Sequence, residues 1–222
     1  MVDETFEHHS DYSLIVPGKS WVFVNPSHGC PLGCPYCIEK KDKWFKNRVT
    51  PVYSAPETLR KIEDSPLVLK HKSPLTFYNY SDPFLKENKK DLIHILESLD
   101  QEGWNNMVGL ISKVHPGEDY LERLSRLKNL RLGLFVSYAN LPSDIERVSS
   151  KDRISLMGEA RSLGIKTVGY VRPLISAWTD IERVRELGAQ MKGGVDAISL
   201  SSIRLTPEIV KSLEARGIEI PK

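Results

Sequence analysis

Three cysteines that lie close together are the residues of this sequence best suited to chemistry. Cys30, Cys34 and Cys37 have the spacing C-x3-C-x2-C, and they are the chain's 3 cysteines. An odd, clustered set is a poor disulfide framework, and in a reducing compartment such sets usually bind metal. Three thiolates on one short loop can ligate three irons of a cubane cluster and leave the fourth iron open to another ligand. The neighbouring Gly29 and Gly33 allow the backbone to bend closely around such a cluster.

A zinc site is one alternative for the same residues. His28 could complete a Cys3His set, which zinc binds in tetrahedral geometry. Zinc sites usually show paired C-x2-C elements, however, and this sequence has no second cysteine pair. A cluster used only for electron transfer is the other alternative. The spacing favours an iron–sulfur cluster with one open iron over both.

Residues 28–37 resemble the signature of the radical S-adenosylmethionine (SAM) superfamily, including the aromatic Tyr36 just before the last cysteine. In that superfamily SAM chelates the open iron. An electron from the cluster then splits SAM into methionine and a 5′-deoxyadenosyl radical, which removes a hydrogen atom from the substrate. The resemblance implies that Cys30, Cys34 and Cys37 hold a [4Fe–4S] cluster and that Tyr36 lies in the SAM pocket. It also implies a reducing partner such as flavodoxin or ferredoxin.

Residues 80–83, Tyr-Ser-Asp-Pro, follow the second predicted strand. Radical SAM proteins often have a Gly-Gly-Glu segment in this region that contacts the SAM amino group. This sequence lacks those glycines, and its Ser-Asp-Pro resembles the corresponding stretch of the spore photoproduct lyase family. Ser81 and Asp82 can accept hydrogen bonds from the SAM ammonium group. The alternative is that one of them caps the next helix.

Polar residues at the ends of three later strands are further candidates for the SAM pocket. Lys113 can pair with the SAM carboxylate, or it faces solvent before a turn. Ser137 and Asn140 stand where the superfamily commonly binds the SAM ribose, although Asn140 also suits a turn before Pro142. Arg172 can reach the SAM carboxylate or an anionic substrate, or it forms a salt bridge at the rim of the fold.

Six short apolar runs predict strands, and amphipathic segments between them predict helices. The runs are rich in Val, Ile, Leu or aromatic residues, which is typical of strands buried on both faces. They are residues 21–25, 75–80, 107–112, 132–138, 167–171 and 195–200. Residues 54–57 and 179–182 match the capping box that opens a helix, and Thr206 with Pro207 opens a final one.

The order of these elements predicts an α/β fold with a parallel sheet. Eight β/α units would close a full barrel of about 250 residues. Six units in 222 residues therefore predict a partial (β/α)6 TIM-like open barrel with parallel strands. We assign residues 21–222 to this core and residues 1–20 to an irregular N-terminal extension. A flat doubly wound sheet is the alternative, and it would also place a site at the C-terminal strand ends.

Composition restricts the partners. The formal net charge is +2, from 31 basic and 29 acidic residues, which gives no broad electrostatic argument for binding nucleic acid. No apolar run approaches the roughly 18–20 residues of a membrane-spanning helix. The acidic N-terminus lacks the order of a secretion signal. We expect a cytoplasmic protein that does not bind membranes.

The preferred function is a radical SAM enzyme that acts on a small molecule, such as a nucleoside or sugar, in a biosynthetic pathway. One alternative is an activating enzyme that makes a glycyl radical on a partner protein. A weaker alternative is repair of a nucleic-acid lesion, because spore photoproduct lyase uses an extra cysteine and this chain assigns all 3 of its cysteines to the cluster. A non-enzymatic metal or electron-transfer module is the remaining class.

Overall fold

The structure, a computed structural model, describes residues 12–175 and 178–218. Within those ranges seven strands form one sheet in the order β1-β2-β5-β6-β7-β8-β9. β1 (Ile15–Pro17) runs antiparallel to β2, and the later neighbours are parallel. The parallel strands are β2 (Val22–Val24), β5 (Leu75–Phe77), β6 (Met107–Ser112), β7 (Arg131–Ser137), β8 (Lys166–Leu174) and β9 (Ala197–Ser202). This arrangement confirms the predicted α/β fold, a partial TIM-like open barrel.

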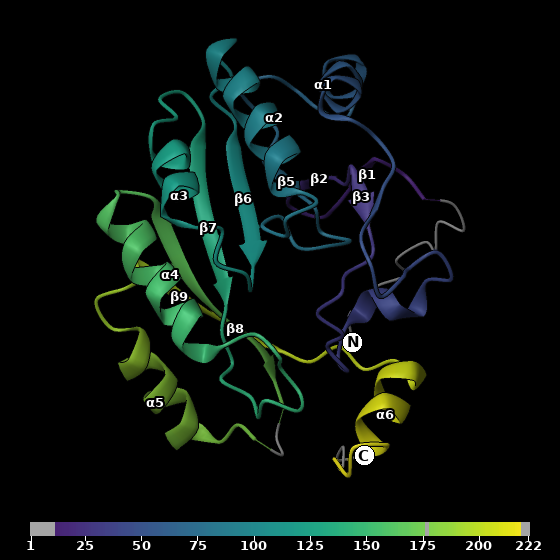
Figure 1. The fold of residues 1–222 in the computed structure, drawn as a ribbon, viewed down its shortest axis with the longest axis vertical. Helices are drawn as coiled ribbons and strands as arrows, with labels where there is room; N and C mark the ends of the chain where they lie inside the picture. The colour runs from purple at the N-terminus through teal and green to yellow at the C-terminus, as the bar shows by residue number, and fades with distance from the viewer. Residues whose placement is uncertain (1–11, 176–177, 219–222) are drawn as a thin grey trace.

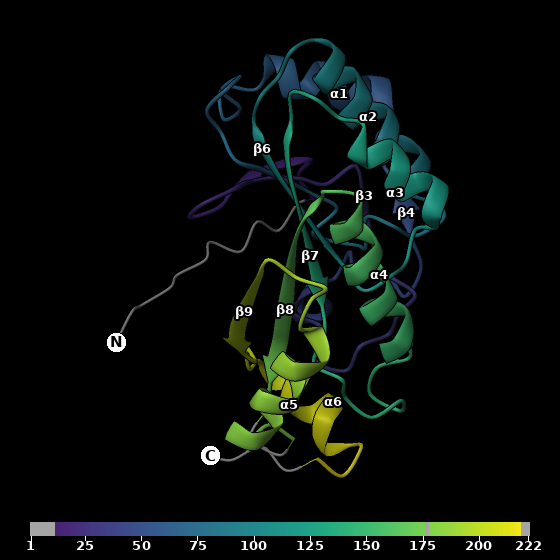
Figure 2. The ribbon, with the colours of Figure 1, turned by 90° about the vertical axis from the view of Figure 1, so that its left-hand side faces the viewer.

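Helices alternate with the parallel strands as predicted, and α2, α3 and α4 cover one face of the sheet (Figures 1 and 2). The helices are α1 (Ala55–Asp64), α2 (Lys89–Gln101), α3 (Glu118–Ser125), α4 (Ser150–Ser162), α5 (Ile181–Met191) and α6 (Pro207–Glu214). α6 lies apart from the others and packs against the short 3-10 helix η1 (Ile38–Lys41). Among the described helices, none has the length and apolar character that crossing a bilayer requires.

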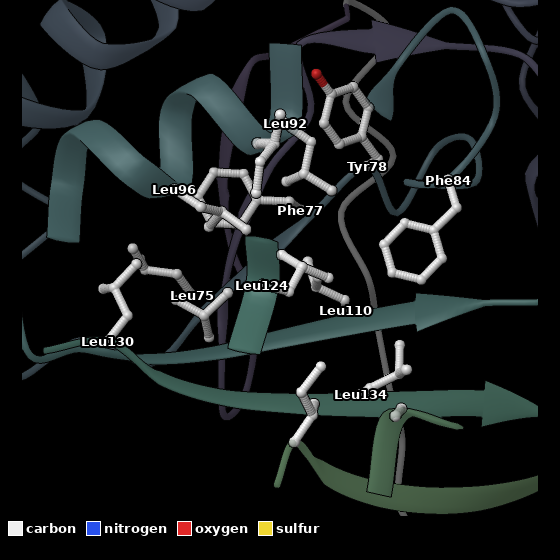
Figure 3. Packing of buried hydrophobic residues seen from close by; sticks show 14 of the residues in the cluster. Leu75, Phe77, Tyr78, Phe84, Leu92, Leu96, Leu110, Leu124, Leu130 and Leu134 are labelled. Carbon is white, nitrogen blue, oxygen red and sulfur yellow. The ribbon is translucent and has the colours of Figure 1, made fainter. Parts of the chain in front are cut away.

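The main core lies between the sheet and the covering helices (Figure 3). Leu92 and Leu96 of α2 pack toward the sheet, where Leu75 and Leu110 are also fully buried. These side chains recur at helical spacing on α2 and at alternate positions on the strands, as each geometry requires. Burying each such side chain contributes about 1.5–3 kcal/mol. This core therefore fixes the strands whose C-terminal ends carry the site.

The opposite face of the sheet is open, which differs from the prediction of strands buried on both faces. On β6, Val108 and Leu110 are 0% exposed, whereas Met107 and Ile111 are 42% and 39% exposed. β8 alternates in the same way. The prediction therefore holds for β5, which is buried at all of its positions, and was wrong for β6 and β8, because an apolar run does not reveal whether anything covers its second face.

Two local predictions also need correction. Residues 1–20 are not wholly irregular, because β1 pairs with β2 in the sheet; residues 1–11 lie outside the described part of the chain. At residues 179–182, the helix cap is Asp180, whose Oδ1 accepts a hydrogen bond of 2.7 Å from the Arg183 amide. The Thr179 hydroxyl instead accepts from the Ile175 amide at 3.3 Å. The capping box at Ser54 and Glu57 is confirmed.

Candidate active site

The three cysteines lie on a loop that leaves the short hairpin strand β3 (Ser27–His28), which pairs with β4 (Thr50–Pro51). The Cys37 amide donates to the Cys34 carbonyl at 3.2 Å, and the Cys30 amide donates to the Lys46 carbonyl at 2.9 Å. Gly29 has φ +82°, and a Cβ there would stand 2.1 Å from the Arg48 carbonyl oxygen. The loop can therefore close only with glycine at this position.

A chain of buried and half-buried hydrogen bonds connects the base of this loop to the start of α2. Asn88, just before α2, accepts from the Ser27 hydroxyl at 2.8 Å and donates to the Ser81 hydroxyl at 3.0 Å. The Ser81 hydroxyl donates in turn to the Gly29 carbonyl at 2.7 Å. Ser81 thus holds the cysteine loop in place, and its hydroxyl proton is already committed. Its predicted contact with the SAM amino group stays a prediction.

All three cysteine side chains line one cavity of about 1400 Å³ at the C-terminal ends of the strands. Burial raises the pKa of Cys30 to about 12 and that of Cys37 to about 11. A cationic iron cluster would reverse that shift, so its binding must release protons. Within residues 12–175 and 178–218, no three His, Cys, Asp or Glu side chains are arranged around a single metal ion. Thiolates that each bind a different iron of a cube do not need such a common point, so this donor set fits a cluster better than zinc.

Asp82 is a buried carboxylate at the edge of the same cavity. Its Oδ1 accepts from the Ser112 hydroxyl at 2.7 Å and the Phe84 amide at 3.0 Å, while Oδ2 accepts from the Lys113 amide at 2.8 Å. Burial raises the pKa of Asp82 even though these donors act in the opposite direction. A carboxylate has about four acceptor positions, so Oδ2 keeps one for a cationic ligand.

Lys113, at the end of β6, belongs to a buried polar group that the sequence did not reveal. Its Nζ lies 2.5 Å from the Ser137 hydroxyl and 3.0 Å from Glu146 Oε1. Glu146 Oε2 forms a second ion pair of 2.6 Å with Arg153 of α4. Burial alone would raise the pKa of Glu146, but the adjacent Lys113 and Arg153 cations hold it below its usual value. Two cations and one anion leave a net positive charge beside the cavity.

Tyr36 connects the cysteine loop to this buried group. Its hydroxyl donates a hydrogen bond to Glu146 Oε1, and Lys113 Nζ lies 5.4 Å from the centre of its ring. Burial, and then the neighbouring Glu146, raise the pKa of Tyr36 well above its usual value. Tyr36 also lines the cavity. The tyrosine is therefore a neutral hydrogen-bond donor that links the cysteine loop to Glu146 and, through it, to the end of β6.

Of the remaining candidates, Arg172 lines the cavity and Asn140 does not. Arg172 donates to the Tyr170 hydroxyl at 2.7 Å. Asn140 has φ +46°, and its side-chain oxygen accepts from the Ser150 hydroxyl at 2.7 Å in the connection to α4. The geometry thus supports the predicted turn at Asn140. Because Asn140 does not line the cavity, the geometry gives no support to its predicted contact with the SAM ribose.

Aromatic rings form much of the remaining cavity wall. Trp21 lies over Gly109 of β6, where a Cβ would come within 3.1 Å of its ring, and it meets Phe135 edge-on at 6.3 Å. Phe135 meets Tyr170 in the same way at 6.3 Å. Within the described residues, the aromatic side chains lining the cavity are Trp21, Phe23, Tyr36, Trp44, Phe45, Tyr80, Phe135 and Tyr170. This open face of the sheet is therefore suited to a ligand with planar or apolar parts.

No family model matches the sequence, and no curated protein matches it. Several solved structures do. Streptococcus suis SuiB bound to S-adenosylmethionine has a TM-score of 0.61 and 16% identity, covering 84% of this chain and 41% of that chain. A Cys-to-Ala variant of spore photoproduct lyase has a TM-score of 0.69 and 15% identity, covering 94% and 64%. Both proteins are radical SAM enzymes.

The chain has the radical SAM fold. The resemblance read from residues 28–37 is thus confirmed at the level of the fold. The chain spans about two fifths of SuiB and 64% of the lyase. A second lyase structure carries bound AdoMet and a dinucleoside spore photoproduct, with a TM-score of 0.66 and 14% identity over 95% of this chain and 64% of that chain.

Asn88, Glu146 and Arg153, which organise this site, were not predicted from the sequence. All three are nearly or fully buried, yet none lies in a recognisable motif. Arg153 shares the buried face of α4 with Leu156, Met157 and Ala160, so their helical spacing is the one signal in the sequence that could have placed it inward. Only the packing of the β7–α4 connection against the cysteine loop brings Glu146 to Tyr36 and Lys113.

Proposed function

We propose that this protein is a radical SAM enzyme acting on a small-molecule substrate. Cys30, Cys34 and Cys37 would hold a [4Fe–4S] cluster, which, when reduced by a partner such as flavodoxin or ferredoxin, supplies the electron that splits SAM and yields a 5′-deoxyadenosyl radical. The observation that carries the proposal is that these three thiols open into the same cavity as Asp82 and Lys113, at the strand ends of a radical SAM fold.

The protein's own residues bind and orient SAM. The free acceptor position of Asp82 Oδ2 suits the SAM ammonium group. Lys113 uses two of its three N–H donors within the protein, and the third suits the SAM carboxylate. Charge-assisted hydrogen bonds of this kind are shorter and stronger than neutral ones. Together the two groups discriminate the two ends of an amino acid, and Arg172, which lines the same cavity, serves SAM or an anionic substrate.

The cavity favours a substrate that has a planar ring, such as a nucleoside, over a plain sugar. Its volume of about 1400 Å³ exceeds the 300–1,000 Å³ of typical ligand pockets, so it has room for more than SAM. Trp44 and Tyr80 lie 4.8 Å apart on the cysteine-loop side, and Phe135 lies on the sheet side. Stacking on aromatic side chains contributes about 1–3 kcal/mol per nucleobase.

A dinucleoside lesion is the second candidate substrate, because a lyase structure of the same fold holds one. The chain has no cysteine besides the three on the loop, so a hydrogen donor for such a reaction would have to be another residue, such as Tyr80 or Tyr170 on the cavity wall. Salt-sensitive binding of a damaged oligonucleotide would favour this substrate over a free nucleoside.

The test is SAM cleavage by anaerobically reconstituted protein. With dithionite as reductant, we expect 5′-deoxyadenosine from the wild type and none from Cys34→Ala. Lys86→Ala, at an exposed lysine, is the control and should match the wild type. A wild-type protein that holds four irons and binds SAM but forms no 5′-deoxyadenosine would refute the proposal, as would purification with one tightly bound zinc and no iron.

A further inference from the structure

Glu146 is a buried carboxylate that joins the cysteine loop to the sheet through one oxygen atom. Its side chain is 1% exposed. Oε1 accepts the hydrogen bond from the Tyr36 hydroxyl and also faces Lys113 Nζ at 3.0 Å. Any movement of Oε1 therefore moves the loop residue between Cys34 and Cys37 together with the lysine at the end of β6.

The other carboxylate oxygen of Glu146, Oε2, is bound by Arg153 of α4. Arg153 donates to Oε2 at 2.6 Å and, from the same nitrogen, to the Ser137 carbonyl at 3.0 Å. Its second terminal nitrogen donates to the Val148 carbonyl at 3.3 Å, and its guanidinium stacks on the Tyr138 ring at 5.3 Å. Arg153 is 1% exposed and is not among the described residues that line the cavity. It fixes the carboxylate without approaching a ligand.

The buried group of Lys113, Glu146 and Arg153 contributes little net free energy to folding for the space that it fills. Desolvating buried ions costs several kcal/mol each, and replacing a buried ion pair or triad by apolar residues of similar volume is often neutral or stabilising. Packing alone therefore gives little reason for three charges here. The arrangement does something that apolar residues cannot do, because it holds a cation at the cavity edge in one orientation. Lys113 is fixed by Ser137 and Glu146 with one N–H left over.

We propose that Glu146 is a positioning residue, which sets the Tyr36 side of the cysteine loop and the Lys113 ammonium at one fixed separation. SAM must reach the cluster and the lysine at once, so this separation determines how well it binds. The inference rests on the proposed function, since it gives Lys113 the SAM carboxylate. Arg153 stabilises the same arrangement by binding the second carboxylate oxygen of Glu146.

Two substitutions separate position from charge. Glu146→Gln keeps the length of the side chain and removes its charge, whereas Glu146→Asp keeps the charge and shortens the reach by one methylene. We expect both to raise the KM for SAM by about 10-fold to 100-fold, as loss of hydrogen bonds to charged groups predicts, with kcat for 5′-deoxyadenosine changed less than about 3-fold. Glu159→Gln is the matched control, because Glu159 pairs with His115 at 2.9 Å on the outer side of α4, and it should keep the wild-type KM.

A readout on the cluster-free protein tests the same geometry without any catalysis. In Glu146→Gln and in Tyr36→Phe, amide hydrogen exchange of residues 30–41 should be at least about 10-fold faster than in the wild type, while exchange in α2 stays the same. An unchanged KM for SAM in both Glu146 variants would overturn the inference. So would a wild-type KM in Glu146→Asp with a raised one in Glu146→Gln, since charge alone would then suffice.

These outcomes differ from a failure of the proposed function. If the wild type takes up iron and cleaves SAM, the function stands whatever the Glu146 variants do. If the wild type does neither, the exchange experiment still reports whether Glu146 holds the loop. A Glu146→Gln protein that does not fold leaves Glu146→Asp and Tyr36→Phe to decide, because both keep more of the buried group.

Discussion

The two faces of the central sheet bury neighbouring residues of the same strands to different degrees. On the helix-covered face, Leu110 of β6 and Leu134 of β7 are 0% exposed. On the open face, the adjacent Ile111 is 39% exposed, and Phe135 is half-buried beside the cavity. One strand thus supplies the core with one side chain and the site with the next, because successive side chains of a strand point to opposite faces.

The difference shows what an incomplete barrel offers. A closed barrel of eight strands fills its interior with layers of side chains. Here Trp21 lies over Gly109, and the cavity that it lines also reaches the cysteine loop. The helix-covered face therefore determines stability, whereas the open face determines which ligands fit.

The largest effect should follow truncation on the covered face. Leu110→Ala should lower the free energy of unfolding by about 2–5 kcal/mol, because it removes buried methyl groups and leaves a cavity. Ile111→Ala, one residue away on the open face, should change it by about 0.5 kcal/mol or less. Urea unfolding of the cluster-free protein measures both. Equal losses in the two variants would show that the open face is packed after all.

Most of the fold was predictable because it depends on local patterns. β6 was predicted at residues 107–112 and is observed there. What periodicity could not supply is the number of covered faces. Nor could it place α6, which follows β9 in sequence but packs on η1 instead of the sheet, leaving Leu200 51% exposed.

An intermediate effect is expected where the two faces meet at Asp82. In Asp82→Asn, the amide oxygen can still serve Ser112 and Phe84, but the NH2 group replaces the acceptor Oδ2 that serves Lys113. The introduced NH2 group would then face the Lys113 amide, donor against donor, and the SAM ammonium that we propose to bind here would lose its partner. We expect SAM affinity to fall by about 1–3 kcal/mol, measured by titration calorimetry on cluster-loaded protein.

Asp100 provides the control for this substitution. It is also a buried carboxylate held by backbone amides, those of Lys128, Asn129 and Leu130. It belongs to the last turn of α2, however, and the amides that it binds precede β7, at the opposite end of the sheet from the cysteine loop. Asp100→Asn should lower stability and leave SAM affinity unchanged. If it weakened SAM binding as much as Asp82→Asn, the loss would reflect general softening of the fold, and the placement of the ammonium at Asp82 would be wrong.

The site was predictable where its residues stand in order along the chain, and not where they meet only through tertiary packing. Asp82 and Lys113 follow β5 and β6, so the carboxyl edge of the sheet brings them together, and Cys30 follows the hairpin strand β3 into the same cavity. Glu146 and Arg153 come from a connection and a helix, and a charged residue in such places is ordinarily exposed. They are buried because Tyr36 of the cysteine loop and Lys113 at the end of β6 pack against Glu146 in the folded chain.

The smallest effect is expected at Asn140, and it tests how far the site extends along the end of β7. Asn140→Gly removes the bond to the Ser150 hydroxyl but tolerates the positive φ of 46°. Because Asn140 does not line the cavity, SAM affinity should stay within about 2-fold of wild type, which is about 0.4 kcal/mol. Ser137→Ala, three residues earlier, removes the acceptor that orients Lys113, so it should weaken binding by about 1 kcal/mol. If Asn140→Gly weakened SAM binding more than Ser137→Ala, the ribose would lie in the β7–α4 connection, and the ligand would extend beyond the open face that Phe135 and Tyr170 define.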